Sequence, residues 1–95
     1  SHQAKVLLVD DRPENLLAME TVLADLGQDL ICAGSGSEAL RYLLREDVAL
    51  ILLDVQMPGL NGFELAELIR ERQRTQRTPI IFISATSRNE QYVFK

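Results

Sequence analysis

The sequence predicts an α/β protein with an open parallel β-sheet and helices on both of its faces. Short apolar runs rich in branched residues alternate along the chain with segments whose apolar residues recur at helical spacing. The apolar runs carry apolar side chains toward both faces, which is typical of strands buried in a parallel sheet. With 95 residues, of which 46% are hydrophobic and 25% charged, the chain has the composition of one small globular domain.

Four strands and three helices are expected in the order βαβαβαβ, and the start of a fourth helix follows. The expected strands are residues 5–10, 29–33, 48–55 and 79–84. The expected helices are residues 13–26, 35–47 and 61–74, with residues 87–95 as the opening of the fourth. Pro13 suits a first helical turn, and Gly27 suits a position just after a helix end. Each crossover between parallel strands is expected to be right-handed.

The composition argues against several classes of protein. The formal net charge is -4, with ten basic and fourteen acidic residues, so we expect no nucleic-acid partner. No apolar run approaches the roughly 18 to 20 residues that cross a bilayer, and no signal peptide is visible, so we expect no membrane partner. The single cysteine, Cys32, cannot form an internal disulfide, which fits a reducing compartment and a cytoplasmic location. Residues 1–3 are interpreted as a remnant of expression or a disordered start.

Acidic side chains stand where predicted strands end. Asp10 and Asp11 end the first strand, Asp54 ends the third, and Ser84 ends the fourth. Open parallel sheets place their sites beyond the carboxyl ends of the strands, and adjacent strands lie about 4.8 Å apart. If the first and third strands are neighbours, three carboxylates crowd one edge of the sheet with a hydroxyl beside them.

Such a cluster points to a divalent cation and to phosphorus chemistry. Carboxylates this close repel one another, and Mg2+ takes carboxylate oxygens together with water and phosphate oxygens. One carboxylate could then attack phosphorus and form an aspartyl phosphate. A second interpretation stays open for each residue taken alone, because Asp10, Asp11 and Asn61 are also suited to cap helices.

Three stretches of the chain resemble the receiver domain of two-component response regulators. They are VLLVDDRPEN, LILLDVQMPGLNGFEL and PIIFISA, which occur in the family's order and span nearly the whole chain. The Asp-Asp pair, the D-x-x-M-P-x-x-x-G block and the Ser-Ala pair of strand four are jointly specific. The resemblance implies a flavodoxin-like open parallel sheet of strand order 2-1-3-4.

The resemblance also implies a metal site and a phosphoacceptor. Asp54 is similar to the family's phosphoacceptor. Asp10 and Asp11 are similar to its acidic metal pair, in which Asp11 would bind Mg2+ directly and Asp10 largely through water. Gln56 would offer its backbone carbonyl to the ion, and Asp54 would also contribute an oxygen.

Further residues resemble the positions that respond to phosphorylation. Ser84 resembles the switch hydroxyl that moves toward the phosphoryl group, and Ala85 the small residue that lets the group approach. The side chains of Gln56 and Thr86 occupy the two positions that tune phosphoryl lifetime in this family.

The loop after Asp54 has a sequence that constrains its shape. Pro58 fixes one backbone angle, and Gly59 and Gly62 accept angles that other residues resist. We expect these residues to aim the Gln56 carbonyl inward.

The function implied by the resemblance is two-component signalling. A histidine kinase or a phosphotransfer protein would donate a phosphoryl group to Asp54, with Mg2+ as the cofactor. The resulting change would reach an output domain or a partner through the face formed by the fourth strand and the fourth helix. The domain would assist its own phosphorylation and dephosphorylation rather than act as a conventional turnover enzyme, and it could belong to a hybrid kinase or a regulator with an enzymatic output.

The family pattern continues beyond the last residue given. Receiver domains have a fifth strand ending in a lysine, then a proline and a fifth helix, whereas this chain ends at Lys95 within the expected fourth helix. Residues 1–95 are therefore expected to be a receiver domain that is incomplete at its C-terminal end and lacks its fifth strand. The fourth strand would be an exposed apolar edge, open to dimerisation or strand exchange.

Two other interpretations stay open. The segment GSGSEA, from Gly34 to Ala39, fits the G-x-G-x-x-A pattern of a dinucleotide-binding loop, and Asp54 lies eighteen residues after Gly36, near the spacing of a ribose-binding acid. Against it, the segment follows the second strand, which is expected at the edge of the sheet. The chain could also be a receiver-like interaction module that never takes a phosphoryl group.

Overall fold

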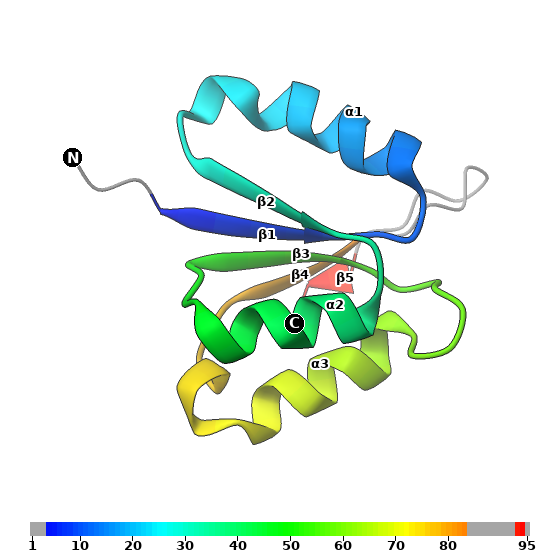
Figure 1. Cartoon of the computed structure of the whole chain (residues 1–95), viewed down its shortest axis with the longest axis vertical. Coiled ribbons are helices and arrows are strands. Elements are labelled where there is room, and N and C mark those ends of the chain that lie inside the picture. The colour runs from blue at the N-terminus through cyan, green and yellow to red at the C-terminus, as the bar shows by residue number, and fades with distance from the viewer. Residues whose placement is uncertain (1–3, 84–92, 95) are drawn as a thin grey trace.

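The computed structural model describes residues 4–83 and 93–94, which form a sheet of strand order β2-β1-β3-β4-β5 (Figure 1). The strands are β1 (Lys5–Val9), β2 (Asp29–Ala33), β3 (Leu50–Asp54), β4 (Ile80–Ile83) and β5 (Val93–Phe94). The first four strands run parallel, so their carboxyl ends share one edge of the sheet. The predicted open parallel sheet of order 2-1-3-4 is confirmed.

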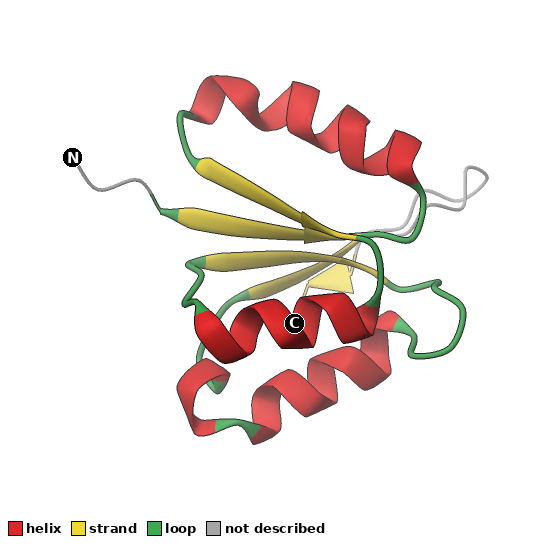
Figure 2. Cartoon of the chain, in the orientation of Figure 1, coloured by secondary structure: helices red, strands yellow, loops and turns green. Residues whose placement is uncertain are grey.

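The helices cover both faces of the sheet. They are α1 (Pro13–Leu23), α2 (Gly36–Arg45) and α3 (Gly62–Glu71), and short 3-10 turns follow at Ala24–Leu26 and Gln73–Thr75. α1 lies on one face, and α2 and α3 lie side by side on the other (Figure 2). In the part of the chain that the structure describes, no helix is long and apolar enough to cross a bilayer.

The prediction for the end of the chain is wrong at two residues. A helix was expected over residues 87–95, but Val93 and Phe94 form β5, which pairs antiparallel with Phe82 and Ile81 of β4. Valine and phenylalanine favour extended backbone, and the outer edge of β4 offers unpaired backbone groups to any strand that can reach it. The sheet therefore has a fifth strand, short and antiparallel, where the sequence predicts none, and it covers part of the β4 edge.

The two faces of the sheet are buried to different depths. The face under α2 and α3 carries the larger core, whose fully buried residues include Leu7, Val9, Leu43, Ile51, Leu53, Leu65 and Ile69. The face under α1 has three buried residues in its cluster, Val6, Leu8 and Leu52. No residue of α1 is itself buried, and Val22 on this helix is 76% exposed. α1 is therefore the least deeply packed of the three helices.

The start of α2 is closed by its own side chains. The Ser35 hydroxyl accepts a hydrogen bond from the Glu38 N–H at 3.1 Å, and the Gly34 N–H donates to the Glu38 carboxylate at 2.7 Å. A dinucleotide phosphate would need these N–H groups, and a carboxylate occupies one of them. β2 also lies at the edge of the sheet, so the geometry around Gly34 favours a capped helix start over the dinucleotide-binding interpretation.

Candidate metal centre

Three carboxylates meet at the carboxyl edge of the sheet. Asp10 and Asp11 follow β1, and Asp54 is the last residue of β3, the strand beside β1. One carboxylate oxygen from each residue lies within 4.8 Å of the others. Asp10 is 3% exposed and Asp54 is 4% exposed, whereas Asp11 is only half-buried. The structure thus brings together the three acids that the sequence predicts to cluster.

Hydrogen bonds fix the position of Asp10. Its Oδ1 accepts from the backbone N–H of Arg12 at 3.0 Å, and its Oδ2 accepts from the side-chain amide of Asn15 at 3.2 Å. The N-cap residue of α1 is Arg12, and no side chain closes that cap, so the helix-cap interpretation of Asp10 and Asp11 is not what the structure has. Asp10 is instead held from the first turn of α1 with its carboxylate beside the other acids.

Asp54 accepts fewer hydrogen bonds than Asp10, and its burial disfavours the ionised carboxylate. Its Oδ1 accepts one hydrogen bond, from the Gln56 N–H at 3.2 Å. Burial, with a smaller contribution from the charges of Asp10 and Asp11, raises the pKa of Asp54 to about 6, while the Gln56 N–H and the Arg12 charge oppose the rise. A buried carboxylate among like charges is stabilised by any cation that enters the cluster.

Close packing, rather than an unusual backbone angle, explains Gly62. A Cβ at this position would lie 2.2 Å from the Asp54 carbonyl oxygen and 2.7 Å from the Val55 Cα, and the Gly62 N–H donates to the Val55 carbonyl at 3.1 Å. The absence of a side chain therefore lets α3 start directly against the end of β3. Gly59, in contrast, has φ of 75°. The prediction that glycine is needed for a backbone angle that other residues resist is therefore confirmed for Gly59 and is wrong for Gly62.

The start of α3 is fixed by a reciprocal cap. The Asn61 side chain accepts from the Glu64 N–H at 2.9 Å, and the Glu64 carboxylate accepts from the Asn61 N–H at 3.0 Å. This capping box confirms the cap interpretation of Asn61. Together with Gly62 it anchors the far end of the loop that leaves Asp54.

Several predicted site residues lie outside the described part of the chain. Ser84, Ala85 and Thr86 are among them, so their roles stay predictions. The last described residue of β4, Ile83, pairs with Asp54, and its carbonyl accepts from the Val55 N–H at 3.3 Å. Gln56 is placed next to Asp54 through its N–H, and the metal role of its carbonyl remains a prediction.

Two residues near the acids were missed from the sequence. Asn15 orients Asp10, and Arg12 lies close enough for its charge to lower the pKa of Asp54. The sequence offered one signal, namely that Arg12 and Asn15 follow the Asp-Asp pair closely, around the start of the helix predicted from residue 13. That spacing allows contact with the strand end but does not by itself distinguish contact from exposure.

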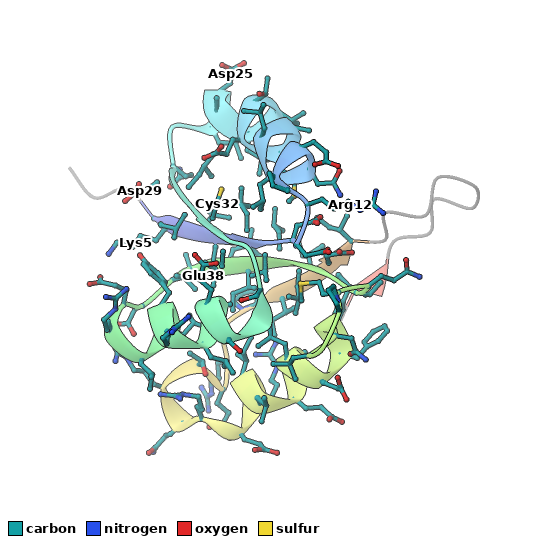
Figure 3. The ribbon with its side chains drawn as sticks, turned by 45° about the vertical axis from the view of Figure 1, so that its right-hand side comes forward. Lys5, Arg12, Asp25, Asp29, Cys32 and Glu38 are labelled. Carbon is teal, nitrogen blue, oxygen red and sulfur yellow. The ribbon has the colours of Figure 1, made fainter. Side chains whose placement is uncertain are left out.

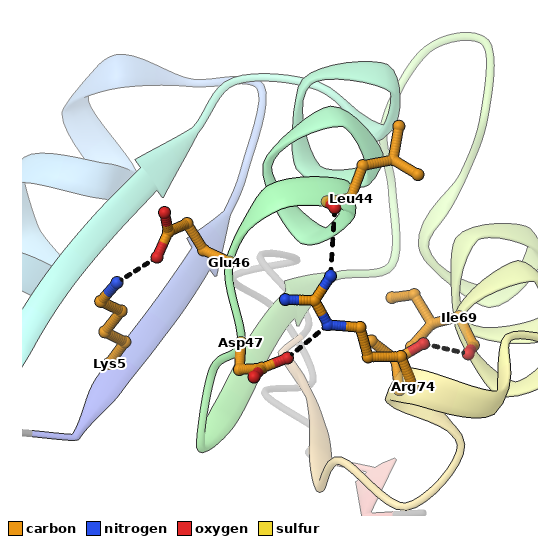
Figure 4. Close-up of polar contacts among 7 residues, drawn as sticks. Lys5, Leu44, Glu46, Asp47, Ile69 and Arg74 are labelled. Atoms are coloured by element: carbon orange, nitrogen blue, oxygen red, sulfur yellow. Dashed lines mark hydrogen bonds and ion pairs between the residues drawn. The ribbon is translucent and has the colours of Figure 1, made fainter.

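The donor set of this cluster fits a hard divalent cation. Carboxylate oxygens are the ligands that Mg2+ prefers, and the three here come from two adjacent rigid strand ends. In the described residues, the two ion pairs lie elsewhere: Lys5 with Glu46 at 2.5 Å, and Arg74 with Asp47 at 2.6 Å (Figure 4). Lys5 begins β1, so its pair lies at the opposite end of the strand from the acids. Neither pair compensates the charge of the acidic cluster.

Comparison with known proteins assigns a family to this open parallel sheet, which carries an acidic cluster at the ends of β1 and β3. The profile of the response regulator receiver domain family matches residues 6–95. The chain belongs to this family, which confirms the resemblance noted in the sequence.

Relatives by sequence include receiver domains within much larger kinases. The sensor protein GacS of Pseudomonas syringae pv. syringae is 40% identical over 88 residues, which is 90% of this chain and 10% of that protein. The signal transduction histidine-protein kinase BarA of Escherichia coli K12 is 36% identical over 80 residues, 84% of this chain and 9% of that protein. The chain therefore spans about a tenth of the length of these relatives.

Solved structures give the same fold. The chemotaxis protein CheY4 of Vibrio cholerae superposes with a TM-score of 0.84 at 31% identity, covering 94% of this chain and 74% of that one. The response regulator TrrA of Thermotoga maritima, solved in complex with Mg(2+)-BeF, gives a TM-score of 0.82 at 32% identity, covering 90% and 72%. The chain is a receiver domain of two-component signalling, homologous to the receivers of hybrid kinases.

Proposed function

We propose that Asp54 accepts a phosphoryl group from the phosphohistidine of a histidine kinase or a phosphotransfer protein, with Mg2+ as the cofactor. One observation carries the proposal: carboxylate oxygens of Asp10, Asp11 and Asp54 lie within 4.8 Å of one another at the carboxyl edge of a receiver-fold sheet. TrrA, a relative by structure, binds Mg2+ with beryllofluoride, which supports the same ligand chemistry here.

The residues of the cluster would bind Mg2+ in two ways, directly or through water. Asp11, the most exposed of the three acids, would bind the ion directly together with Asp54 and the Gln56 carbonyl. Asp10 already accepts hydrogen bonds from Arg12 and Asn15, so it would act mainly through water. The bound ion would offset the repulsion between the acids and withdraw charge from the oxygens of the transferring group.

The transfer step is an in-line displacement at phosphorus. An Asp54 carboxylate oxygen forms the new O–P bond as the P–N bond to the donor histidine breaks. The imidazole nitrogen keeps the bonding electron pair and takes up a proton. Because its pKa is about 6, Asp54 is largely ionised at neutral pH and is a competent nucleophile.

The consequences of phosphorylation involve residues that follow β4. The Ser84 hydroxyl would move toward the phosphoryl group, Ala85 would leave room for it, and the side chains of Gln56 and Thr86 would set its lifetime. The altered face around β4 would contact an output domain or a partner, or a second copy through the part of the β4 edge that β5 leaves open. A phosphodonor of this kind would act in the cytoplasm, on a domain that stands alone, precedes an output domain or belongs to a hybrid kinase.

Phosphorylation of Asp54 can be tested with a small phosphodonor. On incubation with acetyl phosphate and Mg2+, the protein is expected to gain one phosphoryl group by intact mass, and Asp54→Asn is expected to lower the rate more than about a hundredfold, since the nucleophile is gone. Asp25→Asn is the matched control, because Asp25 is exposed and lies just beyond α1, away from the cluster. Removal of Mg2+ with EDTA is expected to stop the reaction.

Two outcomes would count against the proposal. Modification that persists in Asp54→Asn at the wild-type rate would exclude Asp54 as the acceptor. A wild-type protein that binds Mg2+ but is modified neither by acetyl phosphate nor by a phosphohistidine donor would favour the interaction module that takes no phosphoryl group.

A further inference from the structure

β2 has an open outer edge in the part of the chain that the structure describes. It is the end strand of the sheet, whereas β5 covers part of the opposite edge. The Asp29 N–H at the start of β2 and the Ala33 carbonyl at its end bond to residues that flank β1, at 2.9 and 3.1 Å. Because successive residues of a strand turn their backbone groups to opposite sides, Leu30 and Cys32 turn theirs outward, where another strand can pair with them. Figure 3 labels Asp29 at the start of this strand and Cys32 further along it.

A groove beside this edge carries opposite charges at its two ends. It is lined by residues of β2 together with Glu38 and Arg45 of α2, which are both exposed. Glu38 lies at the end of β2, because its carboxylate accepts from the Gly34 N–H at 2.7 Å. Arg45 is the last residue of α2, and the next residue, Glu46, pairs with Lys5 beside the first residue of β2 (Figure 4). The groove is therefore acidic at the end of β2 and basic at its start.

We propose that two copies of this chain pair through their β2 edges, with the two strands antiparallel about a two-fold axis at Ile31. In this register Leu30 of one copy lies opposite Cys32 of the second copy, so their outward N–H and C=O groups bond one another. The same symmetry sets the Glu38 end of each groove against the Arg45 end of the other, which matches opposite charges on both sides of the axis. The edge is thus complementary to itself, as a two-fold contact requires. The inference does not rest on the proposed function.

The position of α2 suits the same contact. This helix packs against both β1 and β2, so it lies over the gap between these strands. With adjacent strands about 4.8 Å apart, the two α2 helices would lie about 10 Å apart across the axis, close to the distance between packed helices. Leu44 of α2 lines the groove and is 53% exposed, and this contact would cover it. Because the paired strands run antiparallel, the two acidic clusters would lie at opposite ends of the joined sheet.

The test reverses the charge at each end of the groove. Wild-type protein, Arg45→Glu and Glu38→Arg are compared by sedimentation equilibrium over a range of concentrations, and the two variants are also mixed in equal amounts. The wild type is expected to dimerise reversibly. Each variant alone is expected to raise the dissociation constant by roughly tenfold or more, because symmetry turns two attractive pairs into repulsive ones. The mixture is expected to recover most of the wild-type affinity, since both pairs are attractive again.

Two further measurements separate this contact from other effects. Glu38→Arg also removes a hydrogen bond at the start of α2, but a variant that merely unfolds would not be recovered by mixing. Glu67→Arg reverses an exposed charge on α3 beside β4, and it should dimerise as the wild type does. As the concentration of the wild type rises, amide exchange measured by NMR should slow at Leu30 and Cys32.

Each other outcome overturns the inference. A wild-type protein that stays monomeric at every concentration would do so, as would a mixture that associates no better than its components. A dimer that Glu67→Arg disrupts, or that slows exchange on β4 and not on β2, would place the contact at the opposite edge of the sheet. None of these results bears on phosphorylation of Asp54, because the acidic clusters lie outside the contact.

Discussion

Replacing Gly62 with alanine is expected to lower the free energy of unfolding by about 3 kcal/mol or more, at the upper end of overpacking effects. The added methyl group would sit 2.2 Å from the Asp54 carbonyl oxygen and 2.7 Å from the Val55 Cα. Both atoms belong to the backbone at the end of β3 and the residue after it, so neither can turn aside as a flexible side chain would. The loss should be measurable by urea denaturation followed by circular dichroism.

Gly59→Ala is the matched control for this change. Gly59 lies in the same loop with φ of 75°, but nothing lies within 4 Å of a Cβ built there. Its replacement should cost only the left-handed backbone strain, about 1 kcal/mol. Equal losses in the two variants would mean that close packing against β3 is not what Gly62 provides.

Replacing Asp54 with asparagine is expected to stabilise the metal-free protein by about 1–2 kcal/mol at pH 7.5, a value reduced from the full pKa shift to allow for solvent screening. Burial holds the pKa of Asp54 at about 6, against 3.8 for an ordinary aspartate. Between these values the native state keeps a proton that the unfolded state has lost. The contribution of Asp54 to stability is therefore full below pH 4 and is lost as the pH rises through 6.

The stabilising effect should disappear as the pH falls toward 4, because Asp54 of the native wild-type protein is then protonated and neutral, as asparagine is at every pH. Urea denaturation of both proteins in EDTA across this range gives the difference directly, and Asp25→Asn should differ from wild type by less than about 0.5 kcal/mol throughout. Added Mg2+ should stabilise wild type more than Asp54→Asn. A constant advantage at every pH would show that the gain does not come from the charge of Asp54.

The fold was predictable because its strands are apolar on both faces. Leu7, Leu8, Ile51 and Leu53 are each fully buried, and only a sheet covered on both sides buries successive residues of a strand in this way. The last turns of the helices were less predictable. The sequence indicates helix to Arg74, but α3 ends at Glu71 and a 3-10 turn follows, in which the Thr75 hydroxyl donates to the Ile69 carbonyl at 2.6 Å.

The meeting of the three acids was predictable for a geometric reason. The carboxyl ends of adjacent parallel strands must share an edge, so acids that follow β1 and β3 come together once those strands pair. The sequence could not show what surrounds them. The hydrogen bonds that Asp10 receives from Arg12 and Asn15 depend on where α1 begins, and the need for glycine at residue 62 depends on how closely α3 approaches β3.

Whether Val93 and Phe94 form a helix or a strand depends on a contact with β4, which is distant in the sequence. Val93 and Phe94 have apolar character that also suits a helix, and local periodicity over so few residues cannot separate the two states. The free edge of β4 decides between them, and that edge exists only after the sheet has formed.

The shallow packing of α1 makes it the element that should open first. With no buried residue of its own, this helix can detach and expose its amides to exchange with solvent at a smaller free-energy cost than α2 or α3. Its first turn nevertheless carries Asn15, which is tied to Asp10. Occupation of the acidic cluster would then be felt along α1 as slower amide exchange, so the loosest helix of the domain would also report whether the site is filled.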